Sequence, residues 1–480
     1  MKIHVRYTLI MLLLCFATGI HGEKEVCEIN RDSIVERLVS RSYPSVFGVW
    51  DHVFDNIPPS GSEWEWSYYK KVLSYRDLVW QSSFRSLSFE KITPEGPKLV
   101  DGEVEHVWYE KGQIQALNPD FIFLIPIYHY GARSEEYPED WQYWLRDEDG
   151  NRIQDTPWEE LLIDFTLPGA EDHFVQMAIA VAECGIFDGI FMDLWSERAE
   201  AAPGPGGIAH LYHGNRVEAL VSLVKRIREA VGDDFLIVVN TRTEKIPRSA
   251  PYVNGAFIET WDAAYPRERL IELEDALSWY EENLRYPQVN CLEVAINVSE
   301  PWDSPANRRL TRAATTLSLT HSNGYILIHG KPENFLSFWY PFFDAPLGST
   351  LGGDETKGVL YETPKGEEIE GLFIREFTNG WAVYNRSGTA QEIELPQEVS
   401  GWNSGVEHQR RHTLADLDGE IYLKSESGLE TSPTVDVNGD GVVNIQDLVI
   451  VANAFGEAAP DVNGDGVVNI QDLVIVANAF

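Results

Sequence analysis

The segment FDGIFMDLW, residues 187–195, ends a short apolar run with an acid, Asp193, and then an indole, Trp195. A short apolar run of this kind is typical of a strand that is buried on both faces of a sheet. Runs of similar character recur between residues 46 and 329. The expected strands are Val46–Trp50, Leu78–Ser82, Phe121–Ile127, Ile190–Asp193, Phe235–Asn240, Ala256–Glu259, Cys291–Val298 and Tyr325–His329.

Helical patterns separate these runs, because apolar residues recur there at three- and four-residue spacing. The expected helices include Glu171–Cys184, Arg216–Val231, Arg267–Leu284 and Arg308–His321. Strands that alternate with helices form right-handed βαβ units and a parallel sheet. The pattern therefore predicts an α/β fold of the (β/α)8 TIM barrel type, which we place at residues 40–335. Residues 131–156 are expected to be an insertion in the third loop.

The pattern changes after His329. Two strand-like runs, Leu372–Phe377 and Trp381–Tyr384, flank Thr378-Asn379-Gly380, and Asn-Gly between two such runs predicts a hairpin. With a further strand at Glu392–Leu395, residues 336–425 are expected to form a small antiparallel β-sandwich domain. Residues 426–435 are rich in Ser, Thr and Gly, which is typical of a linker.

Acidic and aromatic residues gather at the expected C-terminal ends of the barrel strands. In barrels of this type the active site is built at those ends. Carboxylates attack or protonate a glycosidic bond, and indole faces stack on sugar rings. A sugar site is therefore expected there, from Trp50, Asp51, His129, Asp193, Trp195, Asn240, Glu259, Trp261, Glu300 and His329.

The same region resembles TIM-barrel glycosidases related to endo-α-1,4-polygalactosaminidases, and more closely the hypothetical glycoside hydrolase families. The motifs that carry the resemblance are DFT at 164–166, FDGIFMD at 187–193, a strand ending in Asn240, GAFIE at 255–259 and REFTNGWAVYN at 375–385. The resemblance implies that Asp193 and Glu259 are the catalytic carboxylate pair. The substrate-binding residues are then expected to be Trp50, Asp51, His129, Trp195, Asn240, Trp261 and His329.

The roles within the pair follow from the neighbouring residues. Phe257 and Ile258 precede Glu259, and apolar surroundings favour the protonated form of a carboxyl group. We therefore assign Glu259 as the proton donor and Asp193 as the nucleophile or base. Two other functions fit the same residues: a non-catalytic carbohydrate-binding barrel, and a structural subunit of an extracellular assembly. The presence of both carboxylates favours a hydrolase that acts on O-glycosyl bonds.

A duplication ends the chain: residues 436–455 and 461–480 both read DVNGDGVVNIQDLVIVANAF. Each copy has oxygen-bearing side chains at loop positions one, three, five, nine and twelve, a backbone carbonyl at seven and glycine at six, which is the spacing of a calcium-binding loop. Two Ca²⁺ ions are therefore expected. Their ligands would be Asp436, Asn438, Asp440, Val442, Asn444 and Asp447 in one loop, and Asp461, Asn463, Asp465, Val467, Asn469 and Asp472 in the other.

The calcium loops differ from an EF-hand, because no helix is expected before either loop and Asp replaces Glu at position twelve. In these respects residues 436–480 resemble the type I dockerin modules of polysaccharide-degrading assemblies. The resemblance implies an all-α module of two loop-helix motifs and a cohesin-like protein partner. Loop positions ten and eleven, usually hydroxylic in dockerins, are Ile445-Gln446 and Ile470-Gln471 here.

The helix after each loop has two apolar faces. Leu448, Val451, Ala452 and Phe455 recur at helical spacing, so we expect this stripe to pack one repeat against the other. Val449 and Ile450 then lie on a different face. Exposed apolar residues in so acidic a protein indicate a contact surface.

The N-terminal residues 1–22 have the pattern of a signal peptide, since Lys2 and Arg6 are followed by an apolar run from Leu9 to Ala17. This run is shorter than the roughly 20 apolar residues that a membrane-spanning helix needs, and no later stretch qualifies. The formal net charge of −38 argues against nucleic acid and anionic membrane surfaces as partners. The sequence therefore predicts a secreted or cell-surface protein.

Overall fold

The computed structural model describes most of the chain between residues 34 and 478. Side chains are described for residues 34–49, 70–80, 107–155, 160–199, 208–262, 264–330, 337–424, 437, 443–456, 460, 462, 467–470 and 472–477. For several short elements between these ranges only the backbone is described. The expected signal peptide, Trp50, Asp51 and most of the two calcium loops lie outside the described residues.

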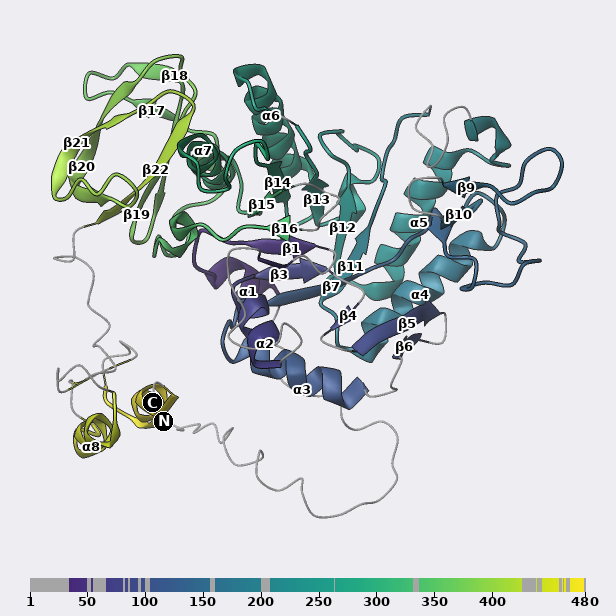
Figure 1. Ribbon diagram of the computed structural model, residues 1–480, viewed down its shortest axis with the longest axis horizontal. Helices are drawn as coiled ribbons and strands as arrows, with labels where there is room; N and C mark the ends of the chain where they lie inside the picture. Colours follow the sequence, from purple (N-terminus) through teal and green to yellow (C-terminus); the bar gives the residue numbers. More distant parts are fainter. Residues whose placement is uncertain are drawn as a thin grey trace, which may run out of the picture.

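The chain is built around a barrel of eight parallel strands, which confirms the predicted fold (Figure 1). In hydrogen-bonded order these are β1 (Phe47–Val49), β3 (Leu78–Trp80), β7 (Ile122–Pro126), β11 (Gly189–Met192), β12 (Leu236–Asn240), β13 (Gly255–Ile258), β14 (Cys291–Ala295) and β15 (Tyr325–His329). A parallel bridge between Val46 and Ile326 joins the first strand to the last. Every residue of these strands is buried, which explains their continuous apolar sequences.

The helices surround the strands, as expected from the alternating pattern (Figure 1). They are α1 (Ile34–Ser40), α2 (Trp66–Ser74), α3 (Val104–Gln115), α4 (Ala170–Cys184), α5 (Arg216–Val231), α6 (Arg267–Asn283) and α7 (Pro305–His321). Local chemistry sets where two of them begin. The Asn215 side chain accepts hydrogen bonds from two backbone N–H groups of α5, and Ser304 caps α7 with Pro305 as its first residue. None of the helices among the described residues has the length and hydrophobicity to cross a bilayer.

Aromatic rings fill the barrel beneath the strand ends. Trp80 stacks on Phe191 with ring centroids 4.5 Å apart, and Phe257 meets the same indole edge-on at 5.0 Å. Successive side chains of a strand alternate between its faces. We call Trp80, Phe191 and Phe257 the aromatic plug. Asp193 and Glu259 lie two residues beyond Phe191 and Phe257, so their side chains also face into the barrel, above the plug.

Gly189, in the segment FDGIFMDLW, allows two neighbouring strands to pack closely. A Cβ atom at Gly189 would lie 2.3 Å from the backbone oxygen of Leu236 on the neighbouring strand β12. Only glycine lets β11 and β12 approach this closely at that point.

Short strands complete the barrel and its loops. The loop after β7 forms a three-stranded sheet from β8 (Gly131–Ala132), β9 (Gln154–Asp155) and β10 (Glu160–Leu162), within and next to the predicted insertion. A second small sheet contains β4 (Ser83–Phe84), β5 (Leu87–Thr93) and β6 (Gly96–Leu99). The strands β16 (Leu336–Ser337) and β2 (Val53–Phe54) extend the edge of the barrel sheet beyond β15.

The next part of the chain forms one curled, six-stranded antiparallel sheet, with strand order β17-β18-β19-β22-β20-β21. Its strands are β17 (Leu360–Glu362), β18 (Glu368–Phe377), β19 (Gly380–Asn385), β20 (Gln391–Gly401), β21 (Gln409–Leu414) and β22 (Asp418–Lys424). The predicted hairpin at Asn379-Gly380 is confirmed, because Phe377 pairs with Gly380. The expected two layers of a sandwich are joined in one sheet, since the long strand β20 pairs with both β21 and β22.

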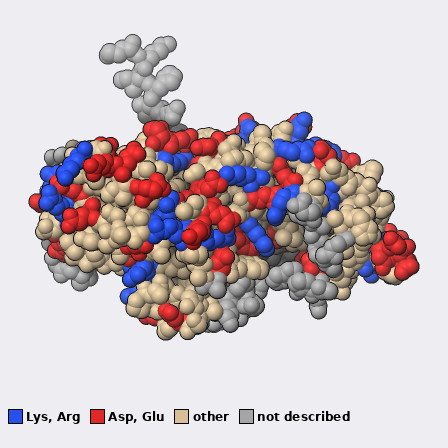
Figure 2. All heavy atoms as spheres, turned by 90° about the horizontal axis from the view of Figure 1, so that it is seen from above, with Lys and Arg blue, Asp and Glu red and all other residues tan. Residues whose placement is uncertain are grey.

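Ion pairs fix this β domain to the barrel. The Arg386 guanidinium makes hydrogen bonds of 2.7, 2.9 and 2.7 Å to the buried carboxylate of Glu274 on α6. Arg312 on α7 forms two hydrogen bonds of 2.8 Å with Asp418 on β22. Paired contacts between an arginine fork and a carboxylate fix orientation as well as distance. On the face drawn in Figure 2, acidic and basic side chains lie interspersed.

The C-terminal repeats contain the helices α8 (Ile445–Asn453) and α9 (Ile470–Asn478). A small core of Val451, Val462, Val468 and Val476 joins the two repeats. Val449 and Ile450 are exposed, as predicted, but Ala452 and Phe455 are exposed as well. The prediction that all of the stripe is buried between the repeats is therefore wrong, because the valines of the loops fill much of that interface.

Candidate functional site

Three of the predicted site residues meet at the C-terminal ends of adjacent strands. Asp193 follows β11, Asn240 ends β12, and Glu259 follows β13. The amide nitrogen Nδ2 of Asn240 donates hydrogen bonds to Asp193 Oδ1 at 2.8 Å and to Glu259 Oε2 at 3.0 Å. A single amide group on the middle strand therefore holds the two carboxyl groups side by side.

The shared donor limits the distance between the two acids. Asp193 Oδ1 and Glu259 Oε2 lie 2.8 and 3.0 Å from the same nitrogen, so these oxygens are at most about 5.8 Å apart. Carboxyl groups about 5–5.5 Å apart are typical of retaining glycosidases, whereas inverting enzymes separate theirs by about 6.5–9.5 Å. The upper bound, which applies to one oxygen of each acid, lies below the range of the inverting enzymes.

Asp193 is held by several donors. Besides Asn240, its carboxylate accepts hydrogen bonds from the backbone N–H of Leu194 at 2.8 Å and from the Tyr130 hydroxyl at 3.4 Å. Leu194 has a φ of 51°, a left-handed conformation that is rare for a branched residue. Burial raises the pKa of Asp193, and the hydrogen bonds from Asn240 and Leu194 oppose that rise.

Glu259 is 8% exposed and has fewer donors than Asp193. Burial, together with the neighbouring charge of Asp193, raises the pKa of Glu259 to about 7. The Arg242 side chain, whose Nε lies 3.9 Å from Glu259 Oε2, acts in the opposite direction. A carboxyl group with this pKa still carries its proton on part of the molecules near neutral pH.

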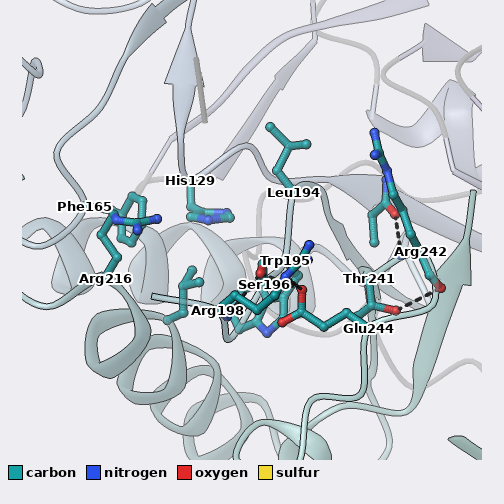
Figure 3. Close-up of a pocket in the computed structure, with 12 residues that line it drawn as sticks. His129, Phe165, Leu194, Trp195, Ser196, Arg198, Arg216, Thr241, Arg242 and Glu244 are labelled. Atoms are coloured by element: carbon teal, nitrogen blue, oxygen red, sulfur yellow. Dashed lines mark hydrogen bonds and ion pairs between the residues drawn. The ribbon is translucent and has the colours of Figure 1, made fainter. Parts of the chain in front are cut away.

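A cavity of about 220 Å³ lies next to the two acids, and Figure 3 shows residues that line it. Asn240 and Leu194 are among its lining residues, whereas Asp193 and Glu259 are not. The other lining residues come from α5 and from the loops after β7, β11 and β12, and they include His129, Trp195 and Arg242. Arg242 also has a left-handed backbone, with a φ of 54°. Leu194 and Arg242, each two residues beyond the end of a barrel strand, thus adopt uncommon conformations at this cavity. Such conformations are concentrated at functional sites.

The predicted substrate-binding residues differ in how far a ligand could reach them. The Trp195 indole is only 1% exposed, and its Nε1 donates to Ser249 Oγ at 3.1 Å. It therefore supports the wall and does not offer a free face. Trp261 is 50% exposed, and the Arg242 guanidinium lies 5.9 Å from the centre of its ring. Of these two indoles, Trp261 is the one available for stacking on a sugar.

The two predicted histidines are buried and neutral. Burial lowers the pKa of His129 to about 3 and that of His329 to about 4. His329 Nε2 lies 3.2 Å from the backbone oxygen of Thr260. Within the described part of the chain, neither ring nitrogen of His129 has a hydrogen-bond partner. Both side chains are therefore part of the barrel mouth, without a charge at neutral pH.

Two other acids that were predicted for the site are Glu300, which lies apart from the pair, and Asp51, which lies outside the described residues. Glu300 is exposed, and its carboxylate accepts a hydrogen bond of 2.7 Å from Ser304 Oγ at the start of α7. It belongs to the cap of that helix. Asp51, with Trp50 beside it, lies outside the described residues, so its expected place in the site stays a prediction.

Sequence reasoning missed a third acid, Glu293, in the middle of strand β14. Its side chain is buried, and its Oε1 lies 3.8 Å from His329 Nε2. Burial, and to a smaller degree the charge of Glu259, raise the pKa of Glu293 well above its ordinary value. A glutamate inside an otherwise apolar strand was the signal, because glutamate is almost never fully buried without a reason.

The calcium loops contribute a different kind of carboxylate. Asp447 and Asp472, at position twelve of each loop, are fully buried. Asp472 accepts hydrogen bonds of 2.7 Å from the backbone N–H groups of Val462 and Asn469, and Asp447 accepts one of 2.8 Å from Asn444. These contacts fold each loop back onto its helix. The donor set of carboxylate, amide and carbonyl oxygens is the one that Ca²⁺ prefers.

Solved structures that resemble this chain are distant. The maltogenic α-amylase AmyB from Thermotoga neapolitana shares 11% identity over 79% of this chain and 99% of its own, with a TM-score of 0.45. An α-amylase from Malbranchea cinnamomea shares 11% identity over 82% of this chain and 97% of its own, with a TM-score of 0.46. Likeness at this level does not transfer an activity or a substrate. No curated protein matches the chain.

Two protein families match the sequence itself. Residues 434–480 match the dockerin type I domain, a kind of domain that generally binds calcium and docks to a cohesin. Residues 127–381 match hypothetical glycosyl hydrolase family 15. This second match spans more than half of the 480 residues and includes Asp193, Asn240 and Glu259. The chain therefore belongs to hypothetical glycosyl hydrolase family 15, on a TIM-like barrel, and ends in a dockerin type I domain.

Proposed function

We propose that the protein is a retaining glycoside hydrolase that acts on a polysaccharide or oligosaccharide through Asp193 and Glu259. The observation that carries this proposal is the shared Asn240 amide, which keeps one oxygen of each acid within about 5.8 Å of the other. The different surroundings of the two acids support different roles. Asp193 has three hydrogen-bond donors that favour its ionised form, whereas Glu259 has a pKa raised to about 7.

The first step of the proposed reaction forms a glycosyl-enzyme. Glu259 gives its proton to the glycosidic oxygen while the bond from that oxygen to the anomeric carbon breaks. Asp193 attacks the anomeric carbon and forms an ester, and the leaving sugar departs with the proton. The aromatic plug below Asp193 excludes water from that side, so the carboxylate meets the developing positive charge without a full hydration shell.

The second step releases the sugar. Glu259, now ionised, takes a proton from water, and the resulting hydroxide equivalent attacks the anomeric carbon and displaces Asp193. The Asn240 amide can follow both carboxylates through this exchange, because it donates to each of them. The Tyr130 hydroxyl, 3.4 Å from Asp193 Oδ2, is placed to stabilise the carboxylate when it leaves.

A covalent trap tests this mechanism. Activated 2-deoxy-2-fluoro glycosides of several sugars would be incubated with the protein, and the masses of the intact chain and of its proteolytic peptides measured. We expect a stoichiometric adduct on the peptide that contains Asp193, and none in Asp193→Asn. Glu300→Gln is the matched control, because Glu300 is an exposed acid at the same end of the barrel. An adduct on another residue would overturn the assignment of Asp193.

For the C-terminal domain, we propose that each repeat binds one Ca²⁺ and that the loaded domain attaches the enzyme to a cohesin-bearing protein outside the cell. Asn444 and Asp447 in one loop, and Val467, Asn469 and Asp472 in the other, are the described residues that would hold the ions, together with the remaining predicted ligands. Calcium would supply folding free energy to a domain whose described part has a small core, with four buried valines. Extracellular location also agrees with the predicted signal peptide at 1–22.

Calorimetry on the full chain tests the metal proposal. The ligand count predicts about two Ca²⁺ ions per chain. Asp447→Ala and Asp472→Ala should each remove about one of them. Binding of fewer than one ion by the unmodified chain would contradict the proposal.

A further inference from the structure

We propose that the protein has a second, non-catalytic glycan-binding site between the barrel and the β domain. A cavity of about 290 Å³ lies at this junction. We call it the junction cavity, and its main lining residues are Trp302, Arg308, Arg312, Tyr340, Phe342 and Trp402. None of its lining residues belongs to the cavity next to Asp193 and Glu259.

The aromatic walls of the junction cavity are fixed in place by their own contacts. Trp302 stacks on Phe338 at 5.8 Å with the two rings 9° from parallel, and its backbone oxygen accepts a 2.7 Å hydrogen bond from the Tyr340 hydroxyl. Trp402 Nε1 donates to the backbone oxygen of Pro341 at 2.9 Å. The cavity is therefore preformed, and a ligand would not have to order these side chains on binding.

The junction cavity combines apolar ring faces with polar groups. Trp402 is 40% exposed although its indole nitrogen is bonded, so an apolar ring surface remains open to solvent. Asn403 and Thr311 also line the cavity and carry groups that can exchange hydrogen bonds with hydroxyls. A sugar ring presents an apolar face and a rim of hydroxyl groups, and indole faces with nearby polar side chains suit both.

The charges around the junction cavity favour a neutral ligand. Arg312 makes two hydrogen bonds of 2.8 Å to Asp418, and Arg308 lies 3.5 Å from Asp303. Each lining guanidinium thus has a carboxylate partner. An anionic sugar would have to compete with those carboxylates, so we commit to an uncharged glycan chain as the ligand.

The junction cavity opens at the catalytic end of the barrel. Trp302 lies in the loop after β14, and Tyr340 lies beyond β15 and β16. Loops that follow parallel barrel strands gather at the end where the strands terminate, which is also the end of Asp193 and Glu259. A glycan bound at the junction cavity would therefore be held at the same end as the proposed catalytic pair.

Binding of polysaccharides tests this site without relying on catalysis. The full chain would be run through native gels that contain soluble starch, galactomannan, xyloglucan, mixed-linkage β-glucan or polygalacturonate. We expect at least one of the four neutral polysaccharides to retard the protein. Trp402→Ala and Arg308→Ala should each weaken that retardation, with a loss on the order of tenfold for an aromatic anchor.

The controls separate this site from the catalytic cavity and from misfolding. Tyr109→Ala removes an aromatic side chain on α3 that is more exposed than Trp402, 64% against 40%, and should bind like the unmodified chain. Glu259→Gln should keep the retardation, so failure of the proposed catalysis would leave this result unchanged. Trp402→Phe, which retains a ring, should bind better than Trp402→Ala and report on the site if the alanine variant is unstable. Retardation by polygalacturonate alone, by no polysaccharide, or equally by Trp402→Ala and the unmodified chain would overturn the proposal.

Discussion

The barrel mouth and the calcium loops both gather carboxylates, but they do so under opposite conditions. At the barrel mouth, Asp193 and Glu259 share one amide donor, and burial raises the pKa of both. In the C-terminal loops, Asp447 and Asp472 are buried against backbone N–H groups of their own repeats. The first arrangement keeps a proton available, and the second keeps oxygen atoms in place for a cation.

This difference shows that the surroundings, more than the residue type, decide what an acid can do. A carboxyl group beside another carboxyl group in an apolar mouth resists ionisation. The backbone N–H groups that contact Asp447 and Asp472 fix the direction of their carboxyl oxygens. Changes made in one region at a time show whether the two kinds of acid act independently.

The largest expected effect comes from the barrel pair. Asp193→Asn keeps the shape of the side chain and removes the nucleophile, so kcat on a confirmed substrate should fall at least about 10³-fold. The measurement is steady-state kinetics, with Glu300→Gln as the control that should keep its activity. Near-normal turnover by Asp193→Asn would mean that Asp193 is not catalytic.

The next largest expected effect is that of calcium removal on the C-terminal repeats. Removal of Ca²⁺ from the full chain with a chelator should abolish the protection of α8 and α9 from hydrogen exchange, because their shared core is small. Protection of the barrel strands should be unaffected, since the barrel has its own large core. Mass-spectrometric hydrogen exchange reports both regions in one experiment. If the barrel also lost protection, the two regions would not be independent.

The pH dependence of catalysis gives a smaller effect. Glu259 must be protonated to act as the donor, and its pKa is raised to about 7. Activity should therefore be present below about pH 7, as long as Asp193 is ionised, and fall as the pH rises through about 7. An ordinary glutamate, with a pKa near about 4.3, would already be ionised there. A profile of kcat/KM against pH measures this. A basic limb below about pH 5 would contradict the assignment of Glu259.

A substitution of Arg242 should move the basic limb of the pH profile of kcat/KM. Its Nε lies 3.9 Å from Glu259 Oε2, and removal of a cation makes the neighbouring carboxyl group harder to ionise. Arg242→Ala should therefore shift the basic limb to higher pH. Arg248→Ala is the matched control, because this arginine pairs with Glu218 away from the site and should leave the limb where it is.

The smallest expected effect is that of Glu293→Gln on kcat/KM. Burial raises the pKa of Glu293 well above the ordinary value, which favours the neutral form. Glu293→Gln keeps the shape of the side chain and cannot ionise. We expect kcat/KM to stay within about tenfold of the unmodified chain, less than the roughly 10²–10⁴-fold loss for a general acid or base. A larger loss without a change in thermal stability would give Glu293 a direct part in the reaction.

Much of this arrangement could be predicted from the sequence. The strand Tyr325–His329 and the helix Arg216–Val231 have the predicted bounds, and the other barrel strands differ by a few residues at their ends. Their apolar runs and helical spacing are local signals, so one sequence suffices to locate them. The adjacency of Asp193, Asn240 and Glu259 followed from the same signals, since consecutive strands of a barrel are neighbours.

Other features depend on contacts that the sequence does not record. The bridging role of Asn240 needs the register of three strands, and the burial of Trp195 needs its hydrogen bond to Ser249. Glu293 was missed because attention to strand ends passes over a residue in the middle of a strand. The exposure of Phe455 depends on how two identical repeats divide one small core, which periodicity within one repeat cannot predict.

The central claim is that Asp193 and Glu259 are close enough for a double displacement. Its most direct test is the stereochemistry of the first product, followed by ¹H NMR of the anomeric protons in the first minutes of hydrolysis, before mutarotation. The distance set by Asn240 predicts that the new reducing end has the same anomeric configuration as the bond that was cleaved. A product of the opposite configuration would show that water attacks directly, and would contradict the account.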